Sequence, residues 1–315
     1  MAKVHLSAVS RTQGNNQAVK DGTVAPQGFE LDFTEVPVLV HAFRRMVREL
    51  EFDVCEMAIT TYICAKDHGK PFTALPIFLV RGFHHDAIVY NTKSDIRSPK
   101  DIEGRRVGVN RGYTVTTGVW ARGILEEEYG VDLKKVTWVL SGDEHVAEYK
   151  EPSNVISLDP GKTLEEALIS GDVDAVVGAE IEHPDVAPLI PNPKERAYEA
   201  LRNHGLYPIN HLIVVKDELL SKYPDLAADL FNTFARSKAL YVEKLRDGSI
   251  ENPTATDKMY MKVMEITGSD PLPYGIEKNR AMIEKLIDHA MSQSIIERRP
   301  DVDSLFAKGA RSLNA

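Results

Sequence analysis

Three side chains able to move a proton follow predicted strands in this sequence. Glu56 is a lone acid among apolar residues, and burial there would keep it protonated as a proton donor. The alternative is a strand-end cap or a buried ion pair with an arginine. His85 and His211 add imidazoles, which exchange protons near neutral pH. We predict a catalytic group of Glu56, His85 and His211, and whether Glu56 or a histidine donates the proton stays open.

A second group of residues has the chemistry to hold an anion. Arg81 follows an apolar strand, where its planar guanidinium can bind a carboxylate through two hydrogen bonds, and a surface ion pair is the alternative. A predicted helix start at Thr114 offers free amides and partial positive charge, and simple N-capping is the alternative. We therefore predict a site for an anionic small molecule. The predicted substrate-binding residues are Arg11, Arg81, Phe83, His84, Thr114, Thr116, Thr117, Glu180 and Asn210.

The histidine pair after Arg81 has a predicted orientation. In an extended chain His84 and His85 point to opposite faces, and His85 then shares a face with Arg81 and Phe83.

The spacing of ligand-type residues does not predict a metal site. The four candidates lack a local pattern such as HExxH, although a divalent metal remains an alternative; they are Glu56, His85, His183 and His211. Cys55 and Cys64 lie nine residues apart without a CxxC pair, so we expect two buried thiols.

Alternating strands and helices must position these residues. Strands are predicted over residues 4–8, 29–33, 52–55, 74–79, 87–91, 107–109, 174–178 and 209–215. Helical spacing appears at residues 43–50, and Ser98 and Thr163 have the sequence of N-caps. From residue 223 onward the pattern is mainly helical, whereas the proline-rich residues 184–193 are predicted to be an exposed loop. This alternation is typical of βαβ units and a mostly parallel sheet.

The order of elements predicts two lobes. The strands before Ser98 and at Ile209 are the passages between an outer and an inner block. One lobe should contain residues 1–87 and 213–315, and the other should be continuous over residues 88–212. The predicted fold is therefore α/β, with two lobes of mixed, mostly parallel sheets, two crossover strands and a ligand cleft between the lobes.

Composition excludes several classes of function. The 315 residues carry a formal charge of −9, which argues against a nucleic-acid surface. The apolar stretch at residues 71–80 is too short to span a bilayer, which takes about 20 residues. The N-terminus lacks the apolar segment of a secretory signal, so we expect a cytoplasmic protein. A homo-oligomer is left open.

Four segments together resemble the 4,5-dihydroxyphthalate decarboxylases, which have a type II periplasmic-binding-protein-like fold. They are FDVCEMAITTY, ALPIFLVRGFHHDAIVYN, SPKDIEGRRVGVNRGYTVTTGVWARGILEEEYGV and PLPYGIEKNR, and the resemblance runs from about Val4 to Ala307. The family pattern Arg-x-Phe-Arg-His is replaced by Arg81-Gly82-Phe83-His84-His85. This change removes one cationic contact and leaves the exact substrate open.

The resemblance implies loss of CO2 from an aromatic dicarboxylate that carries hydroxyls, most simply 4,5-dihydroxyphthalate to 3,4-dihydroxybenzoate. Direct loss would leave an unstable aryl carbanion, so the ring carbon must be protonated first, and a para hydroxyl stabilises that intermediate. Glu56 or His85 would be the acid, His211 the phenol partner, and Arg81 with Thr114 and Thr116 the carboxylate anchor. No flavin or pyridoxal cofactor is expected. The alternatives are a solute-binding protein for an anionic aromatic ligand, a ligand sensor, or a thiamine-pyrimidine synthase of the same fold.

Overall fold

The computed structural model describes residues 3–315, and residues 1 and 2 lie outside the described part. The chain forms two compact units. The first contains the residues up to Arg81 with Ile209–Glu284 and Pro300–Ala315, and the second contains Gly82–Pro208 and Lys285–Arg299. Compared with the boundaries expected from the sequence, the two points at which the chain passes between the units lie a few residues earlier. Residues 285–299 belong to the second unit.

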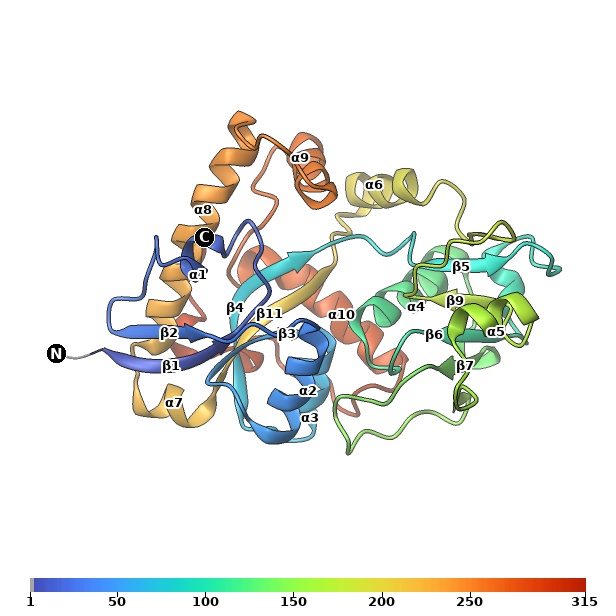
Figure 1. Ribbon diagram of the computed structural model, residues 1–315, viewed down its shortest axis with the longest axis horizontal. Helices are drawn as coiled ribbons and strands as arrows, with labels where there is room; N and C mark the ends of the chain where they lie inside the picture. The colour runs from blue at the N-terminus through green and yellow to red at the C-terminus, as the bar shows by residue number, and fades with distance from the viewer. Residues whose placement is uncertain (1–2) are drawn as a thin grey trace. The chain divides into compact units, whose positions relative to one another are not determined.

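The first unit is built on a five-stranded mixed sheet with strand order β2-β1-β3-β11-β4. β1 pairs in parallel with β2 and β3, whereas β11 runs antiparallel to both β3 and β4 (Figure 1). The sheet therefore brings the ends of β1, β3 and β4 and the start of β11 to one edge. The strands are β1 (Val4–Val9), β2 (Phe29–Phe33), β3 (Val54–Ala58), β4 (Phe72–Arg81) and β11 (Ile209–Lys216).

Helices cover this first sheet because their apolar stripes need a partner surface. α2 and α3 pack on β3, α3 also packs on β11, and α8 packs on β4. The helices of the unit are α1 (Gln17–Lys20), α2 (Leu39–Glu49), α3 (Ile59–Asp67), α7 (Asp217–Lys222), α8 (Leu226–Asp247), α9 (Ala255–Thr267) and the first part of α10 (Arg280–Ser292).

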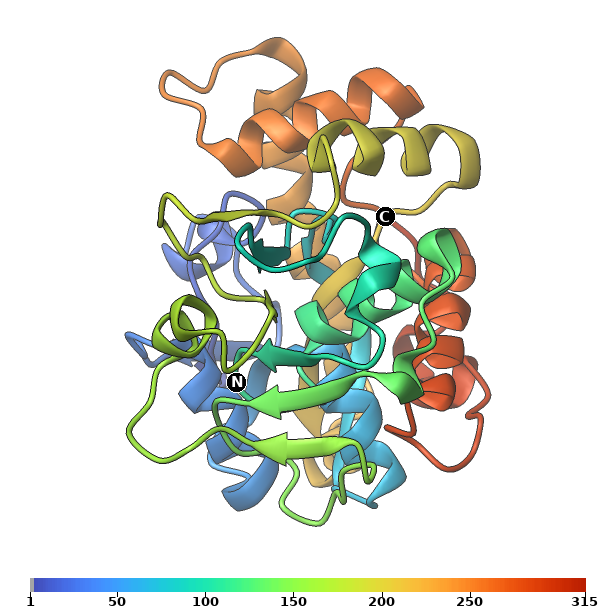
Figure 2. The same cartoon turned by 90° about the vertical axis from the view of Figure 1, so that its right-hand side faces the viewer.

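The second unit contains a six-stranded sheet with order β10-β5-β9-β6-β7-β8. β6, β7 and β8 are parallel neighbours, visible side by side as arrows in Figure 2. The strands are β5 (Ile88–Asn91), β6 (Arg106–Val109), β7 (Thr137–Leu140), β8 (Val155–Ser157), β9 (Ala175–Val177) and β10 (Val186–Pro188). The helices are α4 (Thr116–Tyr129), α5 (Leu164–Ser170), α6 (Pro193–His204) and the rest of α10.

The last part of α10 packs in the second unit through specific contacts. The ring of His289 meets the edge of Trp120 with centroids 5.4 Å apart. Gln293 accepts a hydrogen bond of 2.8 Å from Nε of the buried Arg122. These contacts to α4 explain why residues 285–299 group with the second unit.

Several predicted boundaries were wrong in ways that move site residues. β3 continues to Ala58, so Glu56 lies inside a strand, and β4 continues to Arg81. Residues 59–67 form α3, a helix that the sequence pattern did not predict because a buried helix has no polar face to reveal it. α4 starts at Thr116, which leaves Thr114 in the preceding turn. The proline-rich residues 184–193 include β10, so they are not simply an exposed loop.

Other predictions were confirmed. The Thr163–Glu166 capping box opens α5, and Ser98 opens a single 3-10 turn, Pro99–Ile102. Cys55 and Cys64 are both buried free thiols. Among residues 3–315, no helix combines the length and apolar character needed to cross a bilayer.

Candidate functional site

Strand pairing in the first unit brings Glu56 and His211 together. In the antiparallel pair of β3 and β11, Glu56 lies opposite Ile213, and His211 lies opposite Ala58. Glu56 and His211 are therefore diagonal neighbours on one face, a separation that long side chains can bridge. The His211 Nδ1 lies 2.6 Å from the Glu56 Oε1. Two of the three predicted catalytic residues thus form a hydrogen-bonded pair.

The carboxylate of Glu56 is enclosed by further donors from the loop after β1. The parallel register of Val9 with Cys55 runs this loop alongside Glu56. The backbone N–H of Arg11 donates to Glu56 Oε2 at 3.0 Å, and Gln13 Nε2 donates to Oε1 at 3.3 Å. The Glu56 side chain is 0% exposed. Both of its oxygens are therefore occupied by protein groups, and a substrate cannot reach them directly.

His211 has a different environment from its partner. Its side chain is 19% exposed, and its ring meets Phe43 of α2 edge-on with centroids 5.2 Å apart. Because Nδ1 faces Glu56, the other ring nitrogen, Nε2, is the one that can meet a ligand. A carboxylate hydrogen-bonded to one ring nitrogen of an imidazole fixes the orientation of the ring.

Arg81 ends β4, next to the start of β11. The ladder between these strands is irregular on either side of His211, and such bulges re-aim side chains. Arg81 is buried, and its Nη1 donates to Asn279 Oδ1 at 2.7 Å. Burial raises the pKa of Tyr260 to about 12, while a backbone hydrogen bond from Arg81 and the charges of Arg81 and Arg11 act in the opposite direction. The positive charges of Arg81 and Arg11 therefore both oppose the rise in the pKa of Tyr260 that burial causes.

A pocket of about 860 Å³ lies beside this group within the first unit. Its lining includes Arg11 and Gln13, the two residues that hydrogen-bond Glu56, and also Tyr260. The side chain of Arg11 is exposed. The charged residues of the lining are two cations, Arg11 and Lys244, and two acids, Asp21 and Asp257.

The third predicted catalytic residue, His85, lies in the second unit. It is buried, and its Nε2 is 3.1 Å from both carboxylate oxygens of Glu128 on α4. The predicted orientation of the histidine pair assumed an extended chain, whereas β4 ends at Arg81 and the chain turns at His85. The alternation of faces along an extended strand therefore does not apply.

The predicted anion site at Thr114 contains a carboxylate of the protein itself. Glu144 accepts hydrogen bonds from the amides of Tyr113 and Thr114 and, at 2.5 Å, from the Thr114 hydroxyl. A Cβ on Gly112 would lie only 2.6 Å from the carboxyl carbon of Glu144, so a side chain at position 112 would displace this carboxylate. Burial raises the pKa of Glu144 above its ordinary value, and the hydrogen bonds from Thr114 and Tyr113 oppose that shift.

The remaining predicted substrate-binding residues are placed individually. Phe83 meets Tyr198 edge-on and contacts Tyr207 in a tilted arrangement, in the second unit. Asn210 is half-buried in β11 of the first unit. In the second unit, His84 and Thr116 are buried, Thr117 is half-buried, and Glu180 is exposed.

Sequence reasoning missed Gln13, Asn279, Tyr260 and Glu144. Each reaches its partner through a contact of long sequence separation, such as the 30 residues between Thr114 and Glu144. Asn279 had one signal, because it closely follows the PLPYG run.

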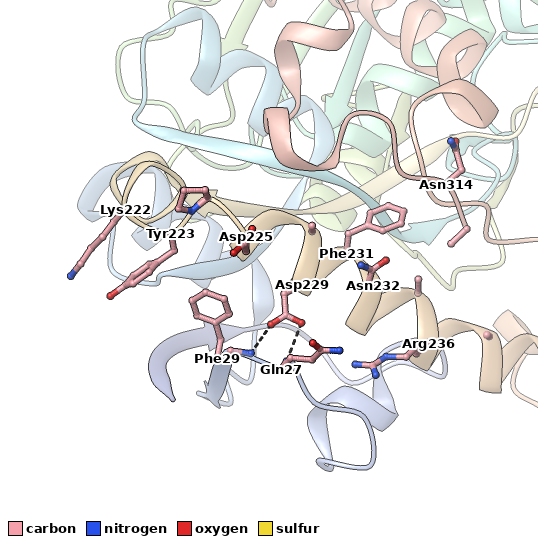
Figure 3. A pocket seen from close by; sticks show the side chains of 16 residues that line it. Gln27, Phe29, Lys222, Tyr223, Asp225, Asp229, Phe231, Asn232, Arg236 and Asn314 are labelled. Carbon is pink, nitrogen blue, oxygen red and sulfur yellow. Dashed lines mark hydrogen bonds between the residues drawn. The ribbon is translucent and has the colours of Figure 1, made fainter. Parts of the chain in front are cut away.

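A larger hollow and a possible ligand cluster lie elsewhere in the first unit. The hollow measures about 1140 Å³ along α8, and its Asp229 caps the amides of Gln27 and Gly28 (Figure 3). It contains no predicted site residue. Among the described residues, His5, Glu30 and Asp32 are the group whose ligand atoms lie within 4.8 Å of one another, and all three are exposed.

Comparisons with known proteins place this chain in a family. A family model described as NMT1/THI5 like matches residues 44–244. The chain is 28% identical over 323 residues to a 4,5-dihydroxyphthalate decarboxylase of Comamonas testosteroni, covering 97% of each chain. It is 31% identical over 217 residues to a 4,5-dihydroxyphthalate decarboxylase of Pseudomonas putida, covering 64% of this chain and 83% of the relative.

A solved structure confirms the predicted periplasmic-binding-protein-like fold. The periplasmic aliphatic sulphonate binding protein SsuA of Escherichia coli superposes with a TM-score of 0.55, at 12% identity, covering 99% of this chain and 100% of that one. At this identity the likeness concerns the fold alone. The sequence matches go further: the chain belongs to the NMT1/THI5-like family and to the 4,5-dihydroxyphthalate decarboxylase family, whose named members are carboxy-lyases.

Proposed function

We propose that this protein converts 4,5-dihydroxyphthalate to 3,4-dihydroxybenzoate and CO2. In this reaction His211 donates the proton, and Glu56 orients His211. The observation that carries the proposal is the hydrogen bond of 2.6 Å between the buried Glu56 and the partly exposed His211, on the strand that pairs with Arg81. The names of the two curated relatives support the choice of substrate.

The role of each member of the pair follows from its exposure. Glu56 is fully enclosed, so it acts through His211 rather than on the substrate. The partly exposed imidazolium gives its Nε2 proton to the ring carbon that bears the leaving carboxylate. The C–C bond then breaks, CO2 leaves, and its electron pair restores the aromatic ring. His211 ends neutral and takes a new proton from water.

The substrate supplies the electronic driving force for this step. Each carboxylate of 4,5-dihydroxyphthalate has a hydroxyl para to it, and that hydroxyl stabilises the protonated ring as a cation or dienone. Arg81 binds the carboxylate that stays, so the ring carbon is held near His211. These steps need no organic cofactor, and we propose that none takes part.

The test is incubation of the purified protein with 4,5-dihydroxyphthalate, with CO2 and 3,4-dihydroxybenzoate both measured. Phthalate is the matched control, because it has both carboxylates but lacks the hydroxyls, and it should not react. In D2O the product should carry one deuterium at the new C–H. A chelator added to one sample shows whether a divalent metal is needed.

Release of CO2 from 4,5-dihydroxyphthalate alone supports the proposal. Tight binding of both compounds without CO2 release overturns it and leaves a solute-binding protein for aromatic anions, a role that the SsuA-like fold also permits.

A further inference from the structure

We propose that Asn16 is a positioning residue for the Glu56–His211 pair, because its one side chain holds the main chain of both residues of the loop that hydrogen-bond Glu56. Those two residues are Arg11 and Gln13. Asn16 is 0% exposed, so it acts through them and not on a ligand. The inference deepens the proposed function and rests on it for the role of His211.

The amide of Asn16 makes opposite kinds of hydrogen bond at its two ends. Its Oδ1 accepts the backbone N–H of Gln13 at 2.8 Å. Its Nδ2 donates to the backbone carbonyl of Arg11 at 2.9 Å and to Ser10 Oγ at 3.1 Å. A flipped amide would place its N–H groups against the Gln13 N–H and its oxygen against the Arg11 carbonyl. The orientation of the amide is therefore fixed.

The two residues that Asn16 holds pass this constraint on to the carboxylate. Arg11 accepts from Asn16 through its carbonyl, and its N–H donates to Glu56 Oε2 at 3.0 Å. Gln13 donates its N–H to Asn16, and its side chain donates to Glu56 Oε1 at 3.3 Å. That same Oε1 lies 2.6 Å from His211 Nδ1. Both carboxylate oxygens are thus directed by donors, which sets the acceptor that orients the His211 ring.

The main chain around Asn16 is placed by contacts that do not use its amide. The backbone N–H groups of Asn16 and Gln17 donate to the Gln13 carbonyl at 3.2 and 2.9 Å. Lys20 of α1 donates through Nζ to the Ser10 carbonyl at 2.7 Å. Because these bonds remain when the Asn16 side chain is replaced, a substitution should loosen residues 11–13 without unfolding the loop.

Asparagine has the chemistry that this position needs. A primary amide can accept from one backbone N–H and donate to a carbonyl at the same time. Aspartate at position 16 could still accept from Gln13, but it has no N–H for Arg11 or Ser10. It would also place a buried charge against the Arg11 carbonyl. Alanine would remove all three bonds. The two variants therefore release the loop to different extents.

The tautomer of His211 tests the inference without any dependence on turnover. At a pH where the ring is neutral, ¹⁵N–¹H correlation spectra of histidine-labelled protein should show the proton on Nδ1, because the Glu56 carboxylate is its acceptor. His211→Asn assigns the signals. Asn16→Ala should move part of the population to the Nε2–H tautomer, and Asn16→Asp should move it in the same direction.

Asn91→Ala is the matched control for these spectra. Asn91 is another buried asparagine whose Oδ1 accepts a backbone N–H and whose Nδ2 donates to a carbonyl, but it lies in the second unit. The His211 tautomer should stay unchanged in this variant. Thermal unfolding of each variant shows whether it is folded, and Asn16→Asp serves as the test if Asn16→Ala is not.

Steady-state kinetics with 4,5-dihydroxyphthalate give a second, separate measurement. Asn16→Ala should lower kcat roughly tenfold or more and change KM little, because a misplaced acceptor disturbs the proton donor and not the ligand contacts. In the Glu56→Gln background, Asn16→Ala should lower kcat no further, although its loss of melting temperature should persist.

The outcomes separate this inference from the proposed function. A merely structural role predicts lower melting temperatures in Asn16→Ala and Asn91→Ala alike, with the wild-type tautomer retained in both. That result overturns the inference, as does a wild type whose proton lies on Nε2 of His211. Absence of CO2 release by the wild type overturns the proposed function instead, and the tautomer result still stands or falls separately.

Discussion

Two buried carboxylates, one in each unit, have opposite surroundings. Glu56 in the first unit faces an imidazole that is partly exposed. Glu144 in the second unit is held by the amides of Tyr113 and Thr114 and by a hydroxyl, groups that do not release their protons near neutral pH. The two acids are alike in burial, but they differ in whether a neighbour can carry a proton to a ligand.

The difference teaches how to separate a catalytic acid from a structural one. Burial does not separate the two residues, because both are buried. The free amides predicted in the turn before α4 suggested a ligand site, but a carboxylate of the chain itself accepts their hydrogen bonds. The partner therefore decides the role. The variants below either separate the two acids or bring them together.

The largest expected effect is on turnover at Glu56. Glu56→Gln keeps the size of the side chain but removes the charged acceptor that orients the His211 ring, so kcat should fall by about 10²–10⁴. Steady-state rates with 4,5-dihydroxyphthalate measure it, and Glu144→Gln is the matched control. Near-normal turnover in Glu56→Gln, with a large loss of turnover in His85→Asn, would show that the catalytic acid is His85 of the second unit.

The next effect is on substrate binding at Arg81. Arg81→Ala removes an anchor that acts in the ground state and the transition state alike, so KM should rise roughly tenfold or more while kcat changes little. Thr114→Val, which removes the hydroxyl bound to Glu144, should leave KM nearly unchanged. Equal increases in KM in both variants would show that the Glu144 turn also receives a substrate carboxylate.

A smaller effect is expected on the stability of the second unit. Glu144→Gln places an N–H group among donors and weakens charge-assisted hydrogen bonds, which should cost about 1–3 kcal/mol in the free energy of unfolding. Urea denaturation measures the loss. A variant as stable as the wild type but inactive would contradict the structural role.

The smallest effect concerns the pH dependence of stability. Burial lowers the pKa of His289 below its ordinary value of 6.5, so the folded state binds fewer protons there than the unfolded state. The contribution to stability is complete above pH 6.5 and is lost as the pH falls toward the lowered pKa. His289→Phe should flatten the pH profile of the melting temperature in this window. An unchanged slope would assign the acid sensitivity to another group.

The sequence was sufficient to predict elements that have clear local start and stop signals, and insufficient to predict contacts between distant segments. Thr163 and Glu166 predict the start of α5 because the two residues of the capping box lie close together in the sequence. Strand periodicity placed Glu56 and His211 near strand ends, but their pairing depends on the register between β3 and β11, which no local pattern states. The sequence predicted free amides in the turn at Thr114, but it did not predict the carboxylate from a distant loop that accepts their hydrogen bonds.

The hydrogen bond from the Arg11 backbone to Glu56 has a consequence for how this site can diverge. The donor is a main-chain N–H, so any residue except proline can supply it. Arg11 also lines the pocket. Related proteins can therefore exchange this side chain to admit a new ligand while the acid keeps its donor. Position 11 is a natural place to randomise when a library of altered substrate preference is built.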